Sequence, residues 1–300
     1  MSDLILLDGG TGRELARIGA PFRQPEWSAL SLIEAPHFVS RVHAAYVVAG
    51  ADVITTNSYA VVPFHIGHAR FSGAGEALAA LAGRLAREVA DQATRRVKVA
   101  GSLPPVCGSY RADLFDEVAA RPILDTLIRG LRPYVDHWQA ETLSAIEEAE
   151  LVREALGDDP KPLWLSFTLE DGAVTSGEPR LRSGQTVAEA VVAVIRLKAA
   201  AILFNCSQPE VMGDALDAVQ AVLTRDGAQL DIGVYANAFP PQPKAAEANS
   251  GLDNIRADLS PKGYLAWAKD WRRRGANIVG GCCGIGPEHI SALRDALRAV

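Results

Sequence analysis

A regular alternation of short apolar runs and amphipathic stretches is the feature that most constrains the fold of this chain. Apolar runs rich in β-branched residues are typical of buried strands, and apolar residues recurring every three or four positions are typical of helices. The runs predict eight strands, at residues 4–7, 51–57, 97–102, 138–142, 162–169, 199–204, 231–237 and 277–279, of which 138–142 gives the weakest signal. The stretches between them predict helices at residues 13–18, 37–49, 76–94, 122–135, 186–197, 211–225, 264–274 and 287–297, with another ending at residue 156.

Eight such alternations in 300 residues predict an α/β protein with a single closed (β/α)8 TIM barrel, expected to span residues 1–300 as one domain. Two smaller domains would also fit this length, but no shift in composition marks a boundary. Polar side chains occur at or just after the carboxyl ends of the predicted strands: Asp8, Thr55, Asn57, Glu141, Ser166, Thr168, Cys206, Tyr235, Asn237, Cys282 and Cys283. Active sites of such barrels form at this rim, so we expect these residues to converge there.

Charge and hydropathy argue against two classes of partner. The formal net charge is −6, and the one basic run is Arg272, Arg273 and Arg274. We expect these arginines in the exposed last turn of a helix, where cations suit the helix dipole, so nucleic-acid binding is not predicted. The first residues form no signal peptide, and no apolar run reaches the length of a membrane span. We therefore expect a cytoplasmic protein without a membrane partner.

The most informative chemical motif is the run Gly280-Gly281-Cys282-Cys283-Gly284, which follows the last predicted strand. Thiolate sulfur is a preferred ligand of zinc, and a glycine-rich turn lets two adjacent sulfurs point the same way. Zinc takes four ligands, and the best candidate for a third protein ligand is Cys206, after the sixth strand. Four cysteines in 300 residues make a poor disulfide framework, and a reducing compartment would leave the thiolates free for metal. The alternative is that these cysteines are buried as small hydrophobic side chains.

Several motifs together resemble the homocysteine S-methyltransferase family, whose members are zinc-dependent barrels. The resemblance rests on Leu-Leu-Asp-Gly-Gly at residues 6–10, Thr-Thr-Asn-Ser-Tyr at 55–59, Ala-Glu-Thr at 140–142, Ser-Phe-Thr at 166–168, Asn-Cys at 205–206 and Gly-Gly-Cys-Cys-Gly at 280–284. These motifs run through nearly the whole chain. The resemblance implies an enzyme that transfers a methyl group to the thiol of homocysteine and so forms methionine.

The resemblance also implies a zinc ion bound by Cys206, Cys282 and Cys283, with the homocysteine thiolate as the fourth ligand. A free alkyl thiol has a pKa of roughly 8.5, and coordination removes its proton. No catalytic side chain is implied beyond this zinc-activated thiolate. Asn237 resembles the asparagine that fills the open zinc position in some resting members, although an asparagine after a strand is more often a turn former.

For the amino-acid end of the substrate, the resemblance implies that Asp8 and Glu141 face the homocysteine ammonium. Carboxylates are the chemically sensible partners of an ammonium. From the residues alone, Asp8 fits equally well as a helix cap and Glu141 as a solvated surface charge. Trp27 resembles a tryptophan near the family's substrate pocket, and core packing explains it almost as well. The full set of expected substrate contacts is Asp8, Gly9, Trp27, Thr55, Asn57, Glu141 and Ser166.

The methyl donor follows by elimination. The sequence contains no second domain for cobalamin or folate, and it ends seventeen residues after Cys283, without the extension found in betaine-dependent members. A free sulfonium donor is therefore expected, with S-methylmethionine first and S-adenosylmethionine second. The partners are small molecules, and we expect a monomer or a small homo-oligomer.

Three alternatives stay open at this point. The same site would serve another thiol or a selenol as acceptor, the zinc would have only a structural role, or Cys282 and Cys283 would cycle through a vicinal disulfide. Cys107 and the six histidines are expected to have structural roles. Residues 239–261 are expected to form a long loop that acts as a mobile flap.

Overall fold

The computed structural model describes residues 3–171, 178–241 and 254–298. Its single sheet holds eight strands: β1 (Ile5–Leu6), β2 (Val53–Thr55), β3 (Lys98–Leu103), β4 (His137–Leu143), β5 (Leu163–Phe167), β6 (Ala201–Asn205), β7 (Asp231–Tyr235) and β8 (Ile278–Val279). The strand order is β1-β8-β7-β6-β5-β4-β3-β2, and neighbours pair in parallel. A parallel bridge between Leu7 and Val53 joins β1 to β2 and closes the ring. The predicted (β/α)8 barrel is confirmed.

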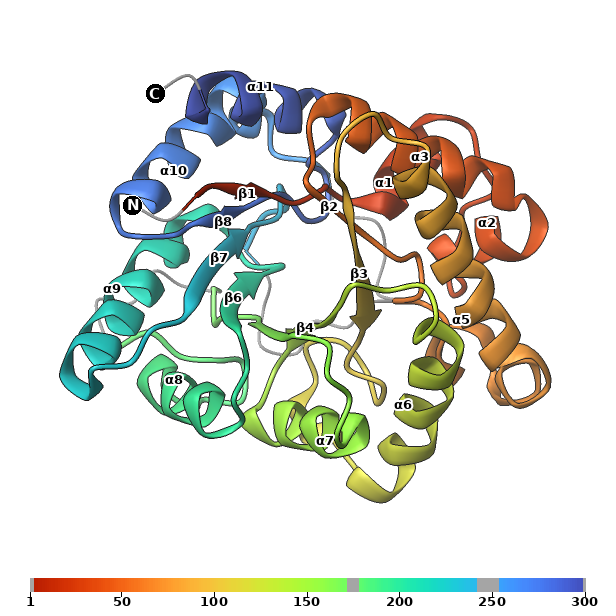
Figure 1. The fold of residues 1–300 in the computed structure, drawn as a ribbon, viewed down its shortest axis with the longest axis horizontal. Helices are drawn as coiled ribbons and strands as arrows, with labels where there is room; N and C mark the ends of the chain where they lie inside the picture. The colour runs from red at the N-terminus through yellow and green to blue at the C-terminus, as the bar shows by residue number, and fades with distance from the viewer. Residues whose placement is uncertain (1–2, 172–177, 242–253, 299–300) are drawn as a thin grey trace.

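Helices surround this ring on its outer side (Figure 1). They are α1 (Thr11–Arg17), α2 (Ser28–Glu34), α3 (Pro36–Ala49), α4 (Pro63–Ile66), α5 (His68–Asp91), α6 (Glu117–Leu131), α7 (Ile146–Leu156), α8 (Val187–Arg196), α9 (Pro209–Asp226), α10 (Pro261–Arg273) and α11 (Pro287–Leu297). Two short 3-10 helices, η1 (Ala112–Leu114) and η2 (Ala257–Leu259), lie in the connections. Because parallel strands need a crossover between them, each helix packs on the outside of the sheet that its flanking strands form.

Two hydrophobic clusters separate the inside of the barrel from its outer layer. The larger cluster lies between the strands and the helices and includes Tyr46, Trp138 and Trp271, all fully buried. The smaller cluster consists of Leu7, Val53, Ala100, Trp164, Ala201, Leu203, Tyr235 and Ile278. Side chains alternate between the two faces of a strand, so the strand residues that do not face the helices point into the barrel. The barrel is therefore packed with side chains below its rim.

The structure corrects several predicted boundaries. The strand with the weakest sequence signal, β4, has seven residues and is buried throughout. The sequence predicts no helix between residues 18 and 37, where α2 lies, and α5 begins at His68 rather than at residue 76. Helix α6 begins at Glu117, because the Asp116 side chain accepts a hydrogen bond from Ala119 N, and Pro122 lies inside the helix rather than at its start.

Other expectations concern the ends of elements and the loops. Arg272 and Arg273 lie in the last turn of α10, as predicted. Within the predicted flap at residues 239–261, residues 242–253 lie outside the described part of the chain. Among the helices that the structure describes, none combines the length and the apolar character that a membrane crossing requires.

Candidate active site

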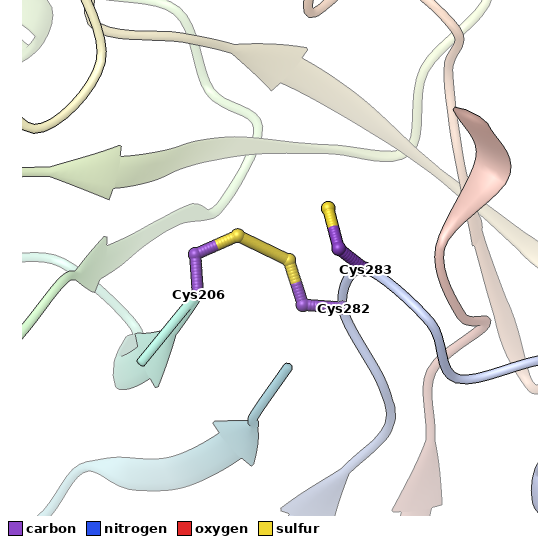
Figure 2. Close-up of side chains that lie close together, drawn as sticks. All are labelled: Cys206, Cys282 and Cys283. Atoms are coloured by element: carbon purple, nitrogen blue, oxygen red, sulfur yellow. A yellow bond between two sulfur atoms is a disulfide. The ribbon is translucent and has the colours of Figure 1, made fainter. Parts of the chain in front are cut away.

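Three cysteines meet at the carboxyl-terminal rim of the barrel. Cys206 directly follows β6, while Cys282 and Cys283 lie in the loop after β8. Their sulfur atoms all lie within 4.8 Å of one another, and Figure 2 shows the three side chains directed toward one space. In the part of the chain that the structure describes, this is the one group of His, Cys, Asp and Glu side chains with such ligand spacing.

A disulfide joins Cys206 to Cys282, and the sulfur of Cys283 lies beside it (Figure 2). The expectation that all thiols are free is thus wrong for this pair. The reason is spatial, since the two Cα atoms are 5.8 Å apart, well within the range that a disulfide spans. The vicinal disulfide that the redox alternative requires is also absent among the described residues, because Cys282 pairs with Cys206 rather than with Cys283.

Backbone hydrogen bonds bring the cysteine loops together. Cys282 N donates to Ala236 O (2.9 Å), and Asn237 N donates to Ser207 O (3.1 Å). Residues 236 and 237 follow β7, which lies between β6 and β8 in the sheet. The loop after β7 therefore holds the two cysteine-bearing loops at a fixed separation.

Glycines allow this part of the rim to pack closely against the loop after β1. A Cβ atom on Gly10 would lie 2.6 Å from Cys282 O, and one on Gly9 would lie 2.2 Å from Ile285 O. The buried Tyr46 hydroxyl donates to Ile285 O (3.1 Å), which fixes the same contact from the helical side. Gly9, predicted to contact substrate, thus has a packing role in the structure, and its contact with substrate stays a prediction.

The cysteine cluster fits a soft metal ion. Three thiolates on one tetrahedral zinc lie about 3.8 Å apart, because each Zn–S bond is about 2.3 Å long. The sulfurs already lie within 4.8 Å of one another, so reduction of the Cys206–Cys282 bond and small side-chain rotations would give that spacing. Asn237 is less ready as a ligand, since its Oδ1 accepts a hydrogen bond from Phe239 N (3.2 Å) in a turn.

A buried carboxylate, Glu141, lies inside the rim at the end of β4. It accepts hydrogen bonds from three strands: Ser102 Oγ (2.5 Å), Tyr235 OH (3.1 Å) and Gln139 Nε2 (3.4 Å). Burial raises the pKa of Glu141, and these three hydrogen bonds act in the opposite direction. The alternative that Glu141 is a solvated surface charge is therefore wrong, since the residue is 9% exposed.

The second buried carboxylate is Asp8, after β1. Its Oδ2 accepts from Thr55 N (2.7 Å) and its Oδ1 from Thr55 Oγ1 (3.0 Å). Burial raises the pKa of Asp8 to about 7, and the negative charge of Glu141 adds to this increase. The alternative that Asp8 caps the following helix is wrong, because Gly10 precedes α1 at that position and the carboxylate is bonded to Thr55 instead.

The remaining predicted contact residues divide into two groups. Thr55 holds Asp8, and Ser166 Oγ donates to Asn205 Oδ1 (2.7 Å), next to Cys206. Asn57 Nδ2 instead donates to Ser28 O (3.0 Å), which anchors the start of α2, where Trp27 packs edge-on against Phe22. In the structure Asn57 and Trp27 thus have packing partners, and their contact with substrate stays a prediction.

Two tyrosines border the cysteines. Burial raises the pKa of Tyr59, and the charges of Glu141 and Cys283 raise it further. Burial likewise raises the pKa of Tyr110, with the charge of Cys283 as the next cause, and the Arg182 guanidinium lies 4.7 Å from the Tyr110 ring centre. Both rings therefore lie near Cys283, and Tyr59 lies near Glu141 as well.

Sequence reasoning did not assign Ser102 and Gln139 to the site, and it placed Tyr235 at the rim without a partner. All three are buried in strands, where the sequence gives no sign of the partner that each contacts. The weak signal was the spacing of Gln139 and Glu141, because residues two apart on a strand face the same side. Cys107 lies apart from the cysteine cluster, with its Sγ 3.8 Å from Asp116 O.

The fold and this geometry define a barrel protein with a soft-metal ligand set at its carboxyl-terminal rim. A family model described as homocysteine S-methyltransferase matches residues 5–297. The chain belongs to this family of methyltransferase enzymes.

Individual relatives agree with the family assignment. Homocysteine S-methyltransferase 1 of Zea mays is 28% identical over 98% of this chain and 94% of its own length. The homocysteine S-methyltransferase YbgG of Bacillus subtilis (strain 168) is 28% identical over 99% of this chain and 95% of its own length. The selenocysteine methyltransferase of Astragalus bisulcatus is 27% identical over 98% of this chain and 92% of its own length.

Solved structures give the same result. The metallated form of the homocysteine methyltransferase MmuM from Escherichia coli is 27% identical and superimposes with a TM-score of 0.73. Its oxidized form is 26% identical, with a TM-score of 0.77. Each alignment covers 98% of this chain and 96% of the MmuM chain.

Proposed function

We propose that this chain is a zinc-dependent enzyme that transfers a methyl group from a sulfonium donor to the thiolate of homocysteine, giving methionine. The observation that carries the proposal is the cluster of three cysteine sulfurs within 4.8 Å of one another, at the same rim as the buried carboxylates of Asp8 and Glu141. Together they offer complementary partners for the two ends of homocysteine, a sulfur at one end and an ammonium at the other.

Cys206, Cys282 and Cys283 would hold the zinc ion once the Cys206–Cys282 bond is reduced. When bound, zinc supplies the chemistry that converts a neutral thiol into a thiolate near neutral pH. The chain's own contribution is to place these side chains, through the backbone bonds of Cys282 to Ala236 and of Asn237 to Ser207.

Glu141 and Asp8 would bind the substrate ammonium. A carboxylate accepts about four hydrogen bonds, and Glu141 receives three from the neutral donors Ser102, Gln139 and Tyr235, so acceptor capacity remains. Burial and, to a smaller extent, the charge of Glu141 raise the pKa of Asp8, and an ammonium between the two carboxylates would offset both effects.

The reaction balances with a cationic donor. The thiolate sulfur forms a bond to the methyl carbon as the carbon–sulfonium bond breaks, the donor leaves as a neutral thioether, and the thiol proton goes to solvent. S-methylmethionine is the first expected donor and S-adenosylmethionine the second. A sulfonium suits a rim that carries an aromatic ring such as that of Tyr59, because aromatic faces attract cations; the ring of Tyr110 already has the Arg182 guanidinium over it.

The test is methionine formation by reduced, zinc-loaded protein from homocysteine and each sulfonium donor. A matched acceptor, 4-mercaptobutanoate, keeps the thiol and lacks the ammonium, so it should react far more slowly if Asp8 and Glu141 act as proposed. Equal rates with both acceptors would contradict the ammonium site. Stoichiometric zinc without methyl transfer from either donor would favour a structural metal instead.

A second acceptor class has one observation in its favour. The chain is 27% identical to a selenocysteine methyltransferase. Because the proposed metal would stabilise a selenolate as readily as a thiolate, selenocysteine and selenohomocysteine belong in the same assay. A kcat/KM for selenocysteine above that for homocysteine would make the selenol the preferred acceptor.

A further inference from the structure

An arginine outside the predicted site, Arg256, lies between the two cysteine-bearing loops. Its guanidinium donates to both oxygens of Glu210 (2.6 and 3.0 Å) and to both oxygens of Asp258 (2.6 and 3.1 Å). It also donates to Gln208 Oε1 (3.0 Å). The side chain is only 20% exposed, so this planar five-donor group is largely committed to neighbours within the protein.

On one side, these contacts reach the loop of Cys206. Gln208 is two residues after Cys206 and directly before α9, whose first turn contains Glu210. Gln208 is 5% exposed and is held a second time, because its N and Nε2 donate to Asp171 at 3.1 and 2.8 Å. Arg256 therefore fixes the position at which the Cys206 loop enters α9.

On the other side, the same residue reaches the loop of Cys283. Arg256 N donates to Ala238 O (2.8 Å), and Ala238 N donates to Cys283 O (2.8 Å). The neighbouring Ile255 side chain lies beside Gly284, 3.4 Å from where a Cβ atom would stand. Two backbone hydrogen bonds through Ala238 thus connect Arg256 to the second cysteine loop.

The backbone of Cys206 needs such support. Its φ is +49°, in the left-handed region that a residue with a Cβ atom adopts at a cost of about 1–3 kcal/mol. A conformation of this kind persists only where surrounding contacts determine it. Leu169 N donates a hydrogen bond to Ser207 Oγ (2.8 Å), which supplies one such contact. The hydrogen bond from Arg256 to Gln208, two residues after Cys206, supplies a second contact.

We propose that Arg256 is a positioning residue for the three cysteine sulfurs, joining the loops after β6 and β8 so that the sulfurs stay within ligand distance of one another. The contacts of Arg256 carry this proposal. Its relevance to metal binding rests on the proposed function. Arg256 faces two carboxylates, so its role is to hold loops rather than to bind an anionic substrate.

The chain offers a matched control. Arg274 also bonds two carboxylates, Asp270 in α10 and Asp217 in α9, and it is 35% exposed. It therefore links the same helix α9 to a neighbouring segment, but without a contact to either cysteine loop. Arg256→Ala and Arg274→Ala remove comparable ion pairs, and only the first removes the proposed link. Arg256→Lys keeps the charge and loses the planar fork.

The first measurement is zinc affinity of the reduced protein by chelator competition, with cobalt(II) substitution to count thiolate ligands by their charge-transfer absorption. We expect Arg256→Ala to weaken zinc binding about 10–100-fold, as loss of a supporting contact around a metal site does. The zinc affinity of Arg256→Lys should lie between that of Arg256→Ala and that of the wild type. The zinc affinity of Arg274→Ala should match that of the wild type. Equal affinities for Arg256→Ala and Arg274→Ala, at similar melting temperatures, would overturn the inference.

The second measurement needs no metal and separates this inference from the proposed function. The equilibrium between the dithiol and the Cys206–Cys282 disulfide in glutathione buffers reports how closely the two loops hold these sulfurs together. Arg256→Ala should shift this equilibrium toward the dithiol by about tenfold or more, whereas Arg274→Ala should not. A wild type without thiolate-bound metal would refute the proposed function alone. An unchanged glutathione equilibrium in Arg256→Ala would refute the positioning role.

Discussion

The two sides of the rim place their functional groups in different ways. On the side of β6 to β8, the cysteines are placed by the backbone: by bonds between loops, by glycines at close approaches and by a left-handed φ at Cys206. On the side of β1 to β4, Asp8 and Glu141 are placed mainly by side-chain donors of neighbouring strands, such as Thr55 and Ser102. The difference indicates that substitutions on the first side should disturb the metal, and those on the second side the amino-acid substrate.

The largest effect is expected from Cys283→Ser. A hydroxyl is a harder and much less acidic ligand than a thiol, so both zinc content and methyl transfer should fall below about 1% of wild type. Metal analysis and a methionine assay on the same preparation would check this. Full zinc content in the variant would remove Cys283 from the ligand set and weaken the division between the two sides.

The next largest effect is expected from Glu141→Gln. The variant keeps the size of the side chain and loses the charge that pairs with the ammonium, a loss of about 1.5–3 kcal/mol. The KM for homocysteine should therefore rise about 10–100-fold, with zinc affinity unchanged. Steady-state kinetics and chelator competition would separate the two. Loss of zinc together with the KM change would place Glu141 in the support of the metal.

Gly10→Ala tests how the cysteine loop is placed, from a position that has no ligand atom and lies in the loop after β1, packed against Cys282. The added Cβ would lie 2.6 Å from Cys282 O, so the cysteine loop must shift. We expect zinc affinity to fall about tenfold or more. Gly73→Ala is the control for the added methyl group, since its Cβ meets nothing within 4 Å and neither Gly73 nor Gly10 has a left-handed φ. Wild-type affinity in Gly10→Ala would show that the rim adapts to the extra atom.

The pH dependence should come from the carboxylate side. The Asp8 pKa is raised to about 7, so the residue is largely neutral below that pH and cannot pair fully with an ammonium. Homocysteine binding should therefore strengthen by up to about tenfold as pH rises from 6 to 8, and Asp8→Asn should remove this change. Calorimetric titration of both proteins would check it, and the difference between them cancels effects of the substrate thiol. A slope that survives in Asp8→Asn would assign the titration to another group.

The smallest effect is expected from Tyr235→Phe. It removes one of three donors to Glu141, and Ser102 and Gln139 remain. The expected cost is about 0.5–1.5 kcal/mol, which corresponds to a rise in KM of roughly twofold to tenfold. Initial-rate kinetics over a range of homocysteine concentrations would measure it. An effect as large as that of Glu141→Gln would mean that the tyrosine contacts the substrate itself.

Much of the fold could be predicted because a buried parallel strand is a short, continuous apolar run, so segments such as residues 199–204 can be recognised from the sequence alone. The strand β4 gave a weaker signal because Gln139 and Glu141 interrupt its apolar pattern, and the side chains of these two residues are hydrogen-bonded to each other. The helix α2 was missed because Pro21 and Pro25 stand just before it and dominate the local pattern.

The site was partly predictable for a different reason. The cysteines and Asp8 lie in short motifs with unusual composition, whereas the partners of Glu141 do not. Ser102 and Tyr235 are 39 and 94 residues from Glu141, and each is unremarkable in its own strand. Only closure of the barrel brings them to one carboxylate. The Cys206–Cys282 disulfide likewise could not be predicted from local sequence, since 76 residues separate the two cysteines.

The left-handed backbone at Cys206 implies a trade-off between folding and function. Glycine adopts a φ of +49° without a steric penalty, so in the reduced protein glycine at position 206 would relieve about 1–2 kcal/mol of backbone strain. Selection for stability alone would therefore remove the cysteine. A cysteine at this position in the chain is consistent with selection for its sulfur, despite the backbone strain that the side chain causes.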